Sequence, residues 1–312
     1  MNKLKRFFLC FVCFLLSLLL TACSGDDTYS KITDFTPHTF VYSDGVADYG
    51  YYNIGNCKKL VGDVYSLVIF LDDDESGWNE EARSVFYSMR FEPSISFITE
   101  KAKTHGVKLN LKYGQYSTKQ DTSKKPRYNG KVENSAEKAI NNLDIFSQTA
   151  KTLGFPNKEV MHAYLQNYTG VEQIAYFIVL NKPGRAYAVC DTTYDGADSI
   201  EFVVAFSSDE YANRAIGSSV IHEMLHLFGA TDLYDSTGHY KKRERLCKKL
   251  YPDDIMRKSS INPDSLSIGR LTECLIGWSD YFPSECDCPE WWETDYEETH
   301  RPHYNSSEEA SS

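Results

Sequence analysis

The sequence predicts a mixed α/β fold, of the α/β or α+β type. Short apolar runs rich in β-formers alternate along the chain with segments whose apolar residues recur at helical spacing. The composition, 42% hydrophobic and 25% charged in 312 residues, is ordinary for a globular protein that buries a sizeable core. No repeat or low-complexity linker interrupts residues 38–288, so we expect one domain there.

The first expected element is a buried strand over Val64–Leu71, followed by an acidic turn at Asp72–Glu75. A helix follows, and Pro93 is expected to break or kink it. The apolar residues that define its expected face recur at i, i+3, i+4 and i+7, namely Ala82, Val85, Phe86 and Met89.

The middle of the chain predicts a half-buried strand over Val107–Leu111 and a second amphipathic helix that stops at Gly154. The face of that helix consists of Ile140, Leu143, Phe146, Ala150 and Leu153. Three strand-like runs come next, before a helix that begins near Asp209 or Ser218. They cover Ile174–Leu180, Ala186–Cys190 and Ile200–Phe206.

The N-terminus is typical of an export signal. Three basic residues precede an apolar run over Phe7–Leu20, whose length of about 14 residues falls short of the roughly 20 that a membrane-spanning helix needs. The sequence Leu-Thr-Ala-Cys that ends this region resembles the bacterial lipobox. The resemblance implies removal of residues 1–22 and a lipid anchor on Cys23 that attaches the protein to a membrane of the bacterial cell envelope. The acidic residues after Cys23 resemble those that some lipoproteins use for surface display.

Charge excludes one class of partner. Removal of residues 1–22 takes away three cations and no acids, which moves the formal net charge from −11 to −14. We therefore expect no binding to nucleic acid. Residues 23–37 are expected to form a tether, and residues 289–312 an acidic, disordered tail.

Cysteine usage suggests disulfide bonds, because an exported chain reaches an oxidising compartment. Six cysteines remain after the signal and Cys23, and they allow 15 connectivities. Cys286 and Cys288 could equally stay reduced or bind a metal. The six are Cys57, Cys190, Cys247, Cys274, Cys286 and Cys288.

The strongest motif is His-Glu-Met-Leu-His-Leu-Phe-Gly-Ala-Thr-Asp, from His222 to Asp232. On a helix, His222 and His226 lie on one face and can bind one ion, while Glu223 lies about 100° around the helix and can accept a proton from water. A glycine at position 229 can end the helix and turn Asp232 back toward that ion. Two imidazoles and a carboxylate leave a catalytic zinc with an open fourth position.

A chance match to His-Glu-x-x-His has a probability of roughly one in a hundred in such a chain. The competing interpretation is a buried amphipathic helix with two hydrogen-bonded histidines. The zinc-site interpretation is supported by the core-facing apolar stripe on the same helix, which consists of Ile221, Leu225 and Phe228.

The motif resembles the zinc signature of the metzincin clan of metallopeptidases, in the snapalysin-like variant in which Asp replaces the third His. Asp254-Ile255-Met256 resembles the clan's Met-turn, with Met256 below the metal. The resemblance covers about residues 200–280, including a helical stripe at residues 268–278. It implies an upper subdomain with a mixed twisted sheet, to about residue 230, and a smaller lower subdomain at residues 231–288.

The chain departs from the clan in two places. We count at least two helices before the motif helix, where the clan usually has one. Lys258 stands where some metzincins have an oxyanion-stabilising tyrosine, and Tyr234, Tyr251 or Arg257 are candidates for that role.

The expected function is a zinc-dependent endopeptidase that hydrolyses protein or peptide substrates outside the cytoplasm. One alternative is a gluzincin-type enzyme with Glu244 or Glu273 as third ligand. Another is an inactive surface-binding lipoprotein on a peptidase fold.

Three lesser features have ordinary explanations beside functional ones. Structural Ca²⁺ could bind at Asp72–Glu75 or at the acidic segment 191–198, although solvated loops explain both. Trp291 and Trp292 are expected to pack against the core. A basic run is expected to be a solvated helix face near the cleft that could favour acidic substrates, and consists of Lys241, Lys242, Arg243 and Arg245.

Overall fold

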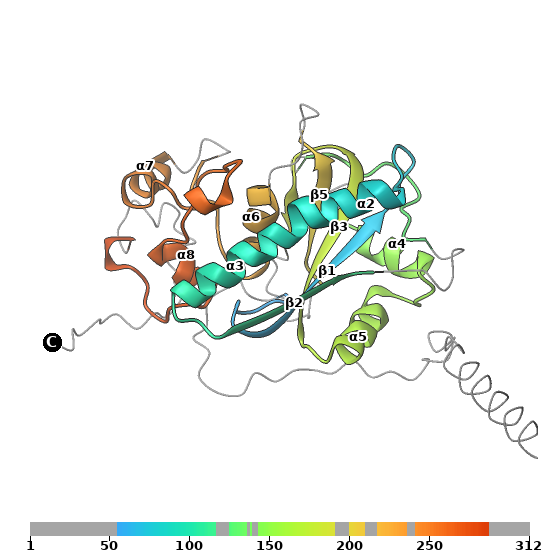
Figure 1. Ribbon diagram of the computed structural model, residues 1–312, viewed down its shortest axis with the longest axis horizontal. Helices are drawn as coiled ribbons and strands as arrows, with labels where there is room; N and C mark the ends of the chain where they lie inside the picture. The colour runs from blue at the N-terminus through green and yellow to red at the C-terminus, as the bar shows by residue number, and fades with distance from the viewer. Residues whose placement is uncertain are drawn as a thin grey trace, which may run out of the picture.

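The computed structural model describes residues 55–116, 125–135, 138, 143–190, 200–209, 217–235 and 241–286 (Figure 1). The expected signal, Cys23, the tether, the acidic tail and Trp291 and Trp292 lie outside these residues. None of the described helices is both long enough and apolar enough to cross a membrane.

A five-stranded mixed sheet forms the centre of the fold, in the order β2-β1-β3-β5-β4. The first four strands in this order run parallel, whereas β4 pairs antiparallel with β5 and forms one edge. The mixed α/β class predicted from the sequence is confirmed. The strands are β1 (Gly62–Leu71), β2 (Leu109–Gln115), β3 (Gln173–Pro183), β4 (Tyr187–Val189) and β5 (Phe202–Ser208).

Helices cover both faces of this sheet, which explains why its central strands are continuous apolar runs. On one face lie α3 (Glu92–Thr104) and α6 (Gly217–Leu227), and on the other α4 (Ile145–Thr152) and α5 (Lys158–Thr169) (Figure 1). Successive residues of β1 alternate between the two hydrophobic clusters, so that Val68 faces α3 and α6 while Ile69 faces α4. The sheet therefore holds α6 against a rigid layer.

The helix predicted before Pro93 differs from expectation in two ways. Pro93 does not end it, because α2 (Glu80–Phe86) continues through the π-helical turn η3 (Tyr87–Phe91), and Pro93 lies in the first turn of α3, where no amide donor is needed. The expected apolar face is also wrong, since Val85 and Met89 are 43% and 48% exposed. A π-helical turn contains one residue more than an α-helical turn. The side chains that follow it therefore point in different directions from those expected for a regular α-helix.

The second predicted helix is α4, and its stop at Gly154 is confirmed by a positive φ of 89° directly after the C-cap. Leu143 is 60% exposed because it precedes the helix, and Ile140 lies outside the described residues. The sequence reasoning missed α5. Only Met161 and Leu165 are large apolar residues on its buried face, which makes its periodicity weak.

The C-terminal part contains α7 (Lys241–Leu250), η5 (Pro263–Ser265), α8 (Arg270–Leu275) and η6 (Ser284–Cys286). The expected helical stripe at residues 268–278 is buried or half-buried, and Leu271 and Leu275 belong to the same hydrophobic cluster as α3 and α6. The basic run of α7 is not wholly solvated, because Arg243 is buried.

No disulfide bond joins the cysteines that the structure describes. Cys57, Cys247, Cys274 and Cys286 are buried instead among core residues. The expectation of disulfides is therefore not met for these positions, and Cys288 lies outside the described residues. Buried thiols are held in the core as small apolar side chains.

Candidate metal centre

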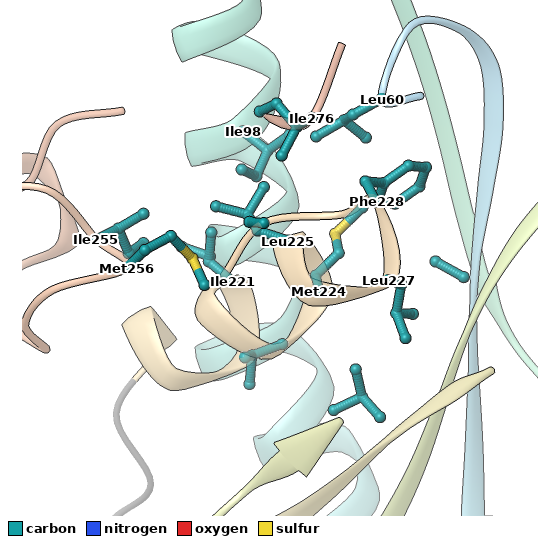
Figure 2. Packing of buried hydrophobic residues seen from close by; sticks show 14 of the residues in the cluster. Leu60, Ile98, Ile221, Met224, Leu225, Leu227, Phe228, Ile255, Met256 and Ile276 are labelled. Carbon is teal, nitrogen blue, oxygen red and sulfur yellow. The ribbon is translucent and has the colours of Figure 1, made fainter. Parts of the chain in front are cut away.

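The motif residues lie on α6, which is positioned by its apolar side. Ile221, Leu225 and Phe228 are buried, as the sequence predicted, in the cluster that α6 shares with α3. Figure 2 shows Leu225 directed toward Ile98 of α3. Because the apolar side of the helix is fixed in this way, the histidines are presented along another side, toward the C-terminal part.

The helix ends just beyond His226, at Leu227, and the chain turns back at Gly229. Gly229 has a φ of 95°, in the left-handed region that favours glycine. The carbonyl of Leu225 accepts hydrogen bonds from the amides of Phe228 and Ala230, at 3.0 and 3.1 Å. This turn, predicted from the sequence, brings Asp232 back to the histidines.

Three ligand-type atoms converge at the turn. Asp232 Oδ1 lies 2.9 Å from His222 Nε2 and 3.4 Å from His226 Nε2. The two Nε2 atoms lie 3.2 Å apart. A tetrahedral ion with bonds of about 2.0 to 2.1 Å holds its ligand atoms about 3.3 Å apart. His222, His226 and Asp232 can therefore hold a metal ion.

The opposite ring nitrogens fix the orientation of both imidazoles. His222 Nδ1 contacts the Ile255 carbonyl at 2.9 Å, and His226 Nδ1 contacts the Ala230 carbonyl at 2.8 Å. Because a carbonyl oxygen only accepts, each Nδ1 carries the proton, and each Nε2 of a neutral ring presents a lone pair to the shared point. Sequence reasoning missed these two carbonyls, since any residue type supplies one.

The donor set fits a cation for a further reason. Asp232 Oδ1 is buried and lacks a hydrogen-bond partner when the two rings are neutral. Three lone-pair atoms within 3.4 Å of one another repel unless a positive charge lies among them. The charge is either a metal ion or a second proton on His222, and the latter is the ordinary explanation of hydrogen-bonded histidines.

The ionisable groups of the site shift one another's pKa values. Burial opposes the charged imidazole, but the hydrogen bond to Asp232 and the charges of Glu223 and Asp232 outweigh it and raise the pKa of His222 to about 9. Burial likewise opposes ionisation of Asp232, yet contacts with the two histidines hold its pKa well below the usual value. Asp232 is therefore an anion at neutral pH, as a metal ligand must be.

Glu223 lies beside the three ligand atoms and is not one of them. Its carboxylate accepts a hydrogen bond from the backbone N–H of Ala188 on the edge strand β4. Burial raises the pKa of Glu223, and the two histidines and the Ala188 amide partly offset this effect. Glu223 therefore lies close to the three residues that could hold an ion, and it is not part of that group.

The turn Asp254-Ile255-Met256 borders the site, because the Ile255 carbonyl contacts His222 Nδ1 at 2.9 Å. Met256 is buried, and Figure 2 shows its side chain next to Ile221 of α6. Its carbonyl accepts the amide of Leu233 at 3.0 Å, which ties the turn to the segment that carries Asp232. The buried carboxylate of Asp254 fixes the turn by accepting the Met256 and Gly269 amides, each at 2.7 Å.

A pocket of about 560 Å³ opens beside His222 and Glu223. It is lined by the segment before β4, the end of β5, the start of α6 and the residues after Met256. Of the three candidates for an oxyanion-stabilising group, Tyr234 and Arg257 line the pocket. Tyr251 does not, because its hydroxyl contacts Glu285 and Cys286.

The other ligand residues considered from the sequence do not join the metal cluster. Glu273 pairs with His105 at 2.7 Å, and neither Glu273 nor Glu244 belongs to the metal cluster. In the acidic turn, Asp73 and Glu75 pair with Lys182, and Asp74 pairs with Arg127. These ion pairs occupy the carboxylates that were considered for Ca²⁺, and the acidic segment 191–198 lies outside the described residues.

Comparisons with known proteins assign the chain to no family. No protein-family model matches the chain, and no curated protein matches it.

Proposed function

We propose that the protein is a zinc-dependent endopeptidase. The observation that carries the proposal is the convergence of His222, His226 and Asp232 on one point, with Glu223 beside them at the edge of a pocket. A carboxylate next to a metal with an open coordination position is the arrangement that metal-assisted hydrolysis requires.

The donor set favours zinc over harder cations. Two imidazole nitrogens and one carboxylate oxygen suit zinc and other late transition metals, whereas Ca²⁺ and Mg²⁺ take oxygen ligands. Three protein ligands, rather than four, are typical of a catalytic zinc and not of a structural one. The backbone carbonyls at Ile255 and Ala230 orient both rings, as the partners of metal-binding histidines do.

Bound zinc would polarise the scissile carbonyl and lower the pKa of water at the site. Glu223 then acts as the general base that takes a proton from the attacking water, and it returns that proton to the leaving amine.

The substrate can bind along the edge strand β4. One side of β4 pairs with β5, and the other side borders Glu223 through the Ala188 amide. An extended peptide that adds to such an edge would lie beside Glu223. This geometry favours an endopeptidase acting on extended chains.

Similarity to the metzincin clan supports the proposal at residues 217–256. The helix with two histidines, the turn at Gly229, the aspartate and the buried Met256 below them occur in the expected order. The helices α4 and α5 cover the face of the sheet opposite α6. They are consistent with the sequence count of more than one helix before the motif helix. They mark a departure from the clan in the upper part of the fold.

Both alternatives are less consistent with the geometry. A gluzincin-type ligand at Glu273 would have to leave its ion pair with His105. An inactive binding protein has no physical need for Glu223, since a buried carboxylate with a raised pKa is a cost to stability unless it has a role. Neither alternative explains the position of Asp232.

Metal removal tests the proposal directly. Purified residues 23–312 should hydrolyse casein, lose this activity after dialysis against a zinc chelator, and regain it with about one equivalent of Zn²⁺ but not with Ca²⁺ or Mg²⁺. The measurement is the release of labelled peptides alongside zinc content by mass spectrometry. Activity that persists in metal-free protein would contradict the proposal.

We further propose that the enzyme is anchored outside the cytoplasm by lipid on Cys23. The Cys23→Ala variant should move from the membrane fraction to the soluble fraction, because two or more acyl chains supply the free energy of anchoring. Cell fractionation with immunoblotting measures this, and a Cys57→Ala variant, which changes a buried core cysteine, is the control. Membrane association of Cys23→Ala equal to that of the native chain would rule out the anchor.

A further inference from the structure

The charges that line the pocket are opposite in sign to the charge of the chain. The protein has 44 acidic and 33 basic residues, Lys and Arg together. Among the described residues beyond the metal centre and Glu223, however, the pocket is lined by Arg185, Arg257 and Lys258 against one acid, Asp209. The cations come from two segments far apart in the sequence. Arg185 precedes β4, and the other two directly follow Met256.

Arg257 is the best placed of the three to bind a ligand. Its Nε and Nη2 atoms donate to the carbonyl of Pro252 at 3.0 and 2.6 Å, which fixes the side chain. Among the described residues, no carboxylate lies within ion-pair distance of its guanidinium. The Nη1 group is left to donate, and a guanidinium held in one orientation is well suited to bind a carboxylate.

The other two cations have different roles. Arg185 donates to the hydroxyl of Tyr234 at 3.2 Å, and the ring of Tyr234 lies 6.0 Å from that of His222, which places a positive charge close to the metal centre. Lys258 is partly neutralised, because its Nζ pairs with Asp253 at 2.6 Å. Arg257 is therefore the cation on this side of the pocket that has no ion pair among the described residues, although Asp253 lies close enough to interact with its charge.

We infer that this pocket selects peptides with a carboxylate next to the scissile bond, bound through Arg257. The inference rests on the proposed peptidase function and names the substrate class of that same site. Arg257 lines the same pocket as His222 and Glu223, so a ligand group bound by Arg257 shares that pocket with the candidate metal centre. A charged hydrogen bond inside a cleft is stronger than one in bulk water.

The carboxylate has two chemical sources. It is either the side chain of Asp or Glu within a peptide or the carboxyl terminus of a peptide chain. The preference for a carboxylate must come from contacts inside the pocket, because the net negative charge of the whole protein repels acidic peptides. Such repulsion is screened beyond about 8 Å at physiological salt.

The first experiment compares hydrolysis of three matched peptide sets. The first set has an internal Glu at each position near the cleavage site and an amidated C-terminus. The second set has Gln at those positions and the same amidated C-terminus. The third set has Gln at those positions and a free C-terminus. The native enzyme should have a kcat/KM about tenfold or more higher for one carboxylate set than for the amidated Gln set. The set that is preferred identifies the source of the carboxylate.

The Arg257→Gln variant should lose most of this preference, so that its kcat/KM values for the carboxylate peptides fall to within about twofold of its own value for the amidated Gln peptides. The matched control is Lys241→Gln, which removes an exposed positive charge on α7 outside the pocket. It should leave the preference intact. Equal kcat/KM values for all three sets, or a preference that survives Arg257→Gln, would overturn the inference.

A binding measurement separates this inference from the proposed function. In the Glu223→Ala background, fluorescence anisotropy should show tighter binding of the carboxylate peptides, an effect that weakens with salt and is lost on Arg257→Gln. If the native protein hydrolyses peptides without acid preference and this binding difference is absent, only the inference fails. If no peptide is hydrolysed but the difference is present, the proposed function fails while the carboxylate site stands.

Discussion

Replacement of Glu223 by Ala should abolish peptide hydrolysis while zinc content stays near one ion per chain. The carboxylate is the only acidic side chain that the structure, in its described part, places both in the pocket and beside the metal ligands. Loss of a general base typically costs about 10²- to 10⁴-fold in rate. The three ligands are untouched, so metal binding should not change.

The isosteric variant Glu223→Gln controls for packing, since Gln has the size of Glu and can still face the Ala188 amide through its oxygen. It should lose activity to the same extent as the Ala variant. The assay measures kcat on a casein-derived peptide together with zinc by mass spectrometry. A Gln variant as active as the native enzyme would show that Glu223 is not the base.

Replacement of Asp232 by Ala should weaken zinc binding by more than about 100-fold. Loss of a second-shell partner already costs about 10- to 100-fold in metal affinity, and Asp232 is placed to be a direct ligand. Competition with a chromogenic chelator measures the affinity. Far-ultraviolet circular dichroism confirms that the variant remains folded.

Two matched variants decide between the clans considered from the sequence. Glu244→Ala and Glu273→Ala each remove a carboxylate from the C-terminal part, but neither residue lies in the metal cluster. Both should bind zinc almost as tightly as the native chain. A large loss of affinity in either variant, with little loss in Asp232→Ala, would contradict the assignment of Asp232.

The local features of the metal centre followed from the sequence, because they depend on helix geometry and on single residues. A separation of four residues is enough to put His222 and His226 on one face. The chain reversal at Gly229 was predictable since a glycine after the last periodic residue commonly ends a helix. The strands β1, β3 and β5 were visible because strands buried on both faces are continuous apolar runs.

The upstream helices were predicted less well, because their sequence signals are weak or misleading. Val85 and Met89 have the spacing of a buried face, but both are exposed, and Met89 lies within the π-turn at Tyr87–Phe91. No propensity scale marks such a turn, since it depends on packing against the sheet. The helix α5 was missed because Met161 and Leu165 alone form too short a pattern.

The sequence by itself determined the set of residues in the candidate site: two histidines and a glutamate at fixed spacing on one helix, and an aspartate after the turn that ends it. Only the tertiary structure decided how that set is oriented and what surrounds it. The carbonyls of Ile255 and Ala230 that fix the imidazoles, the Ala188 amide that holds Glu223, and the arginines of the pocket come from separate segments. Backbone groups are the same at every residue, so their positions follow from the packing of the chain and from no side-chain pattern.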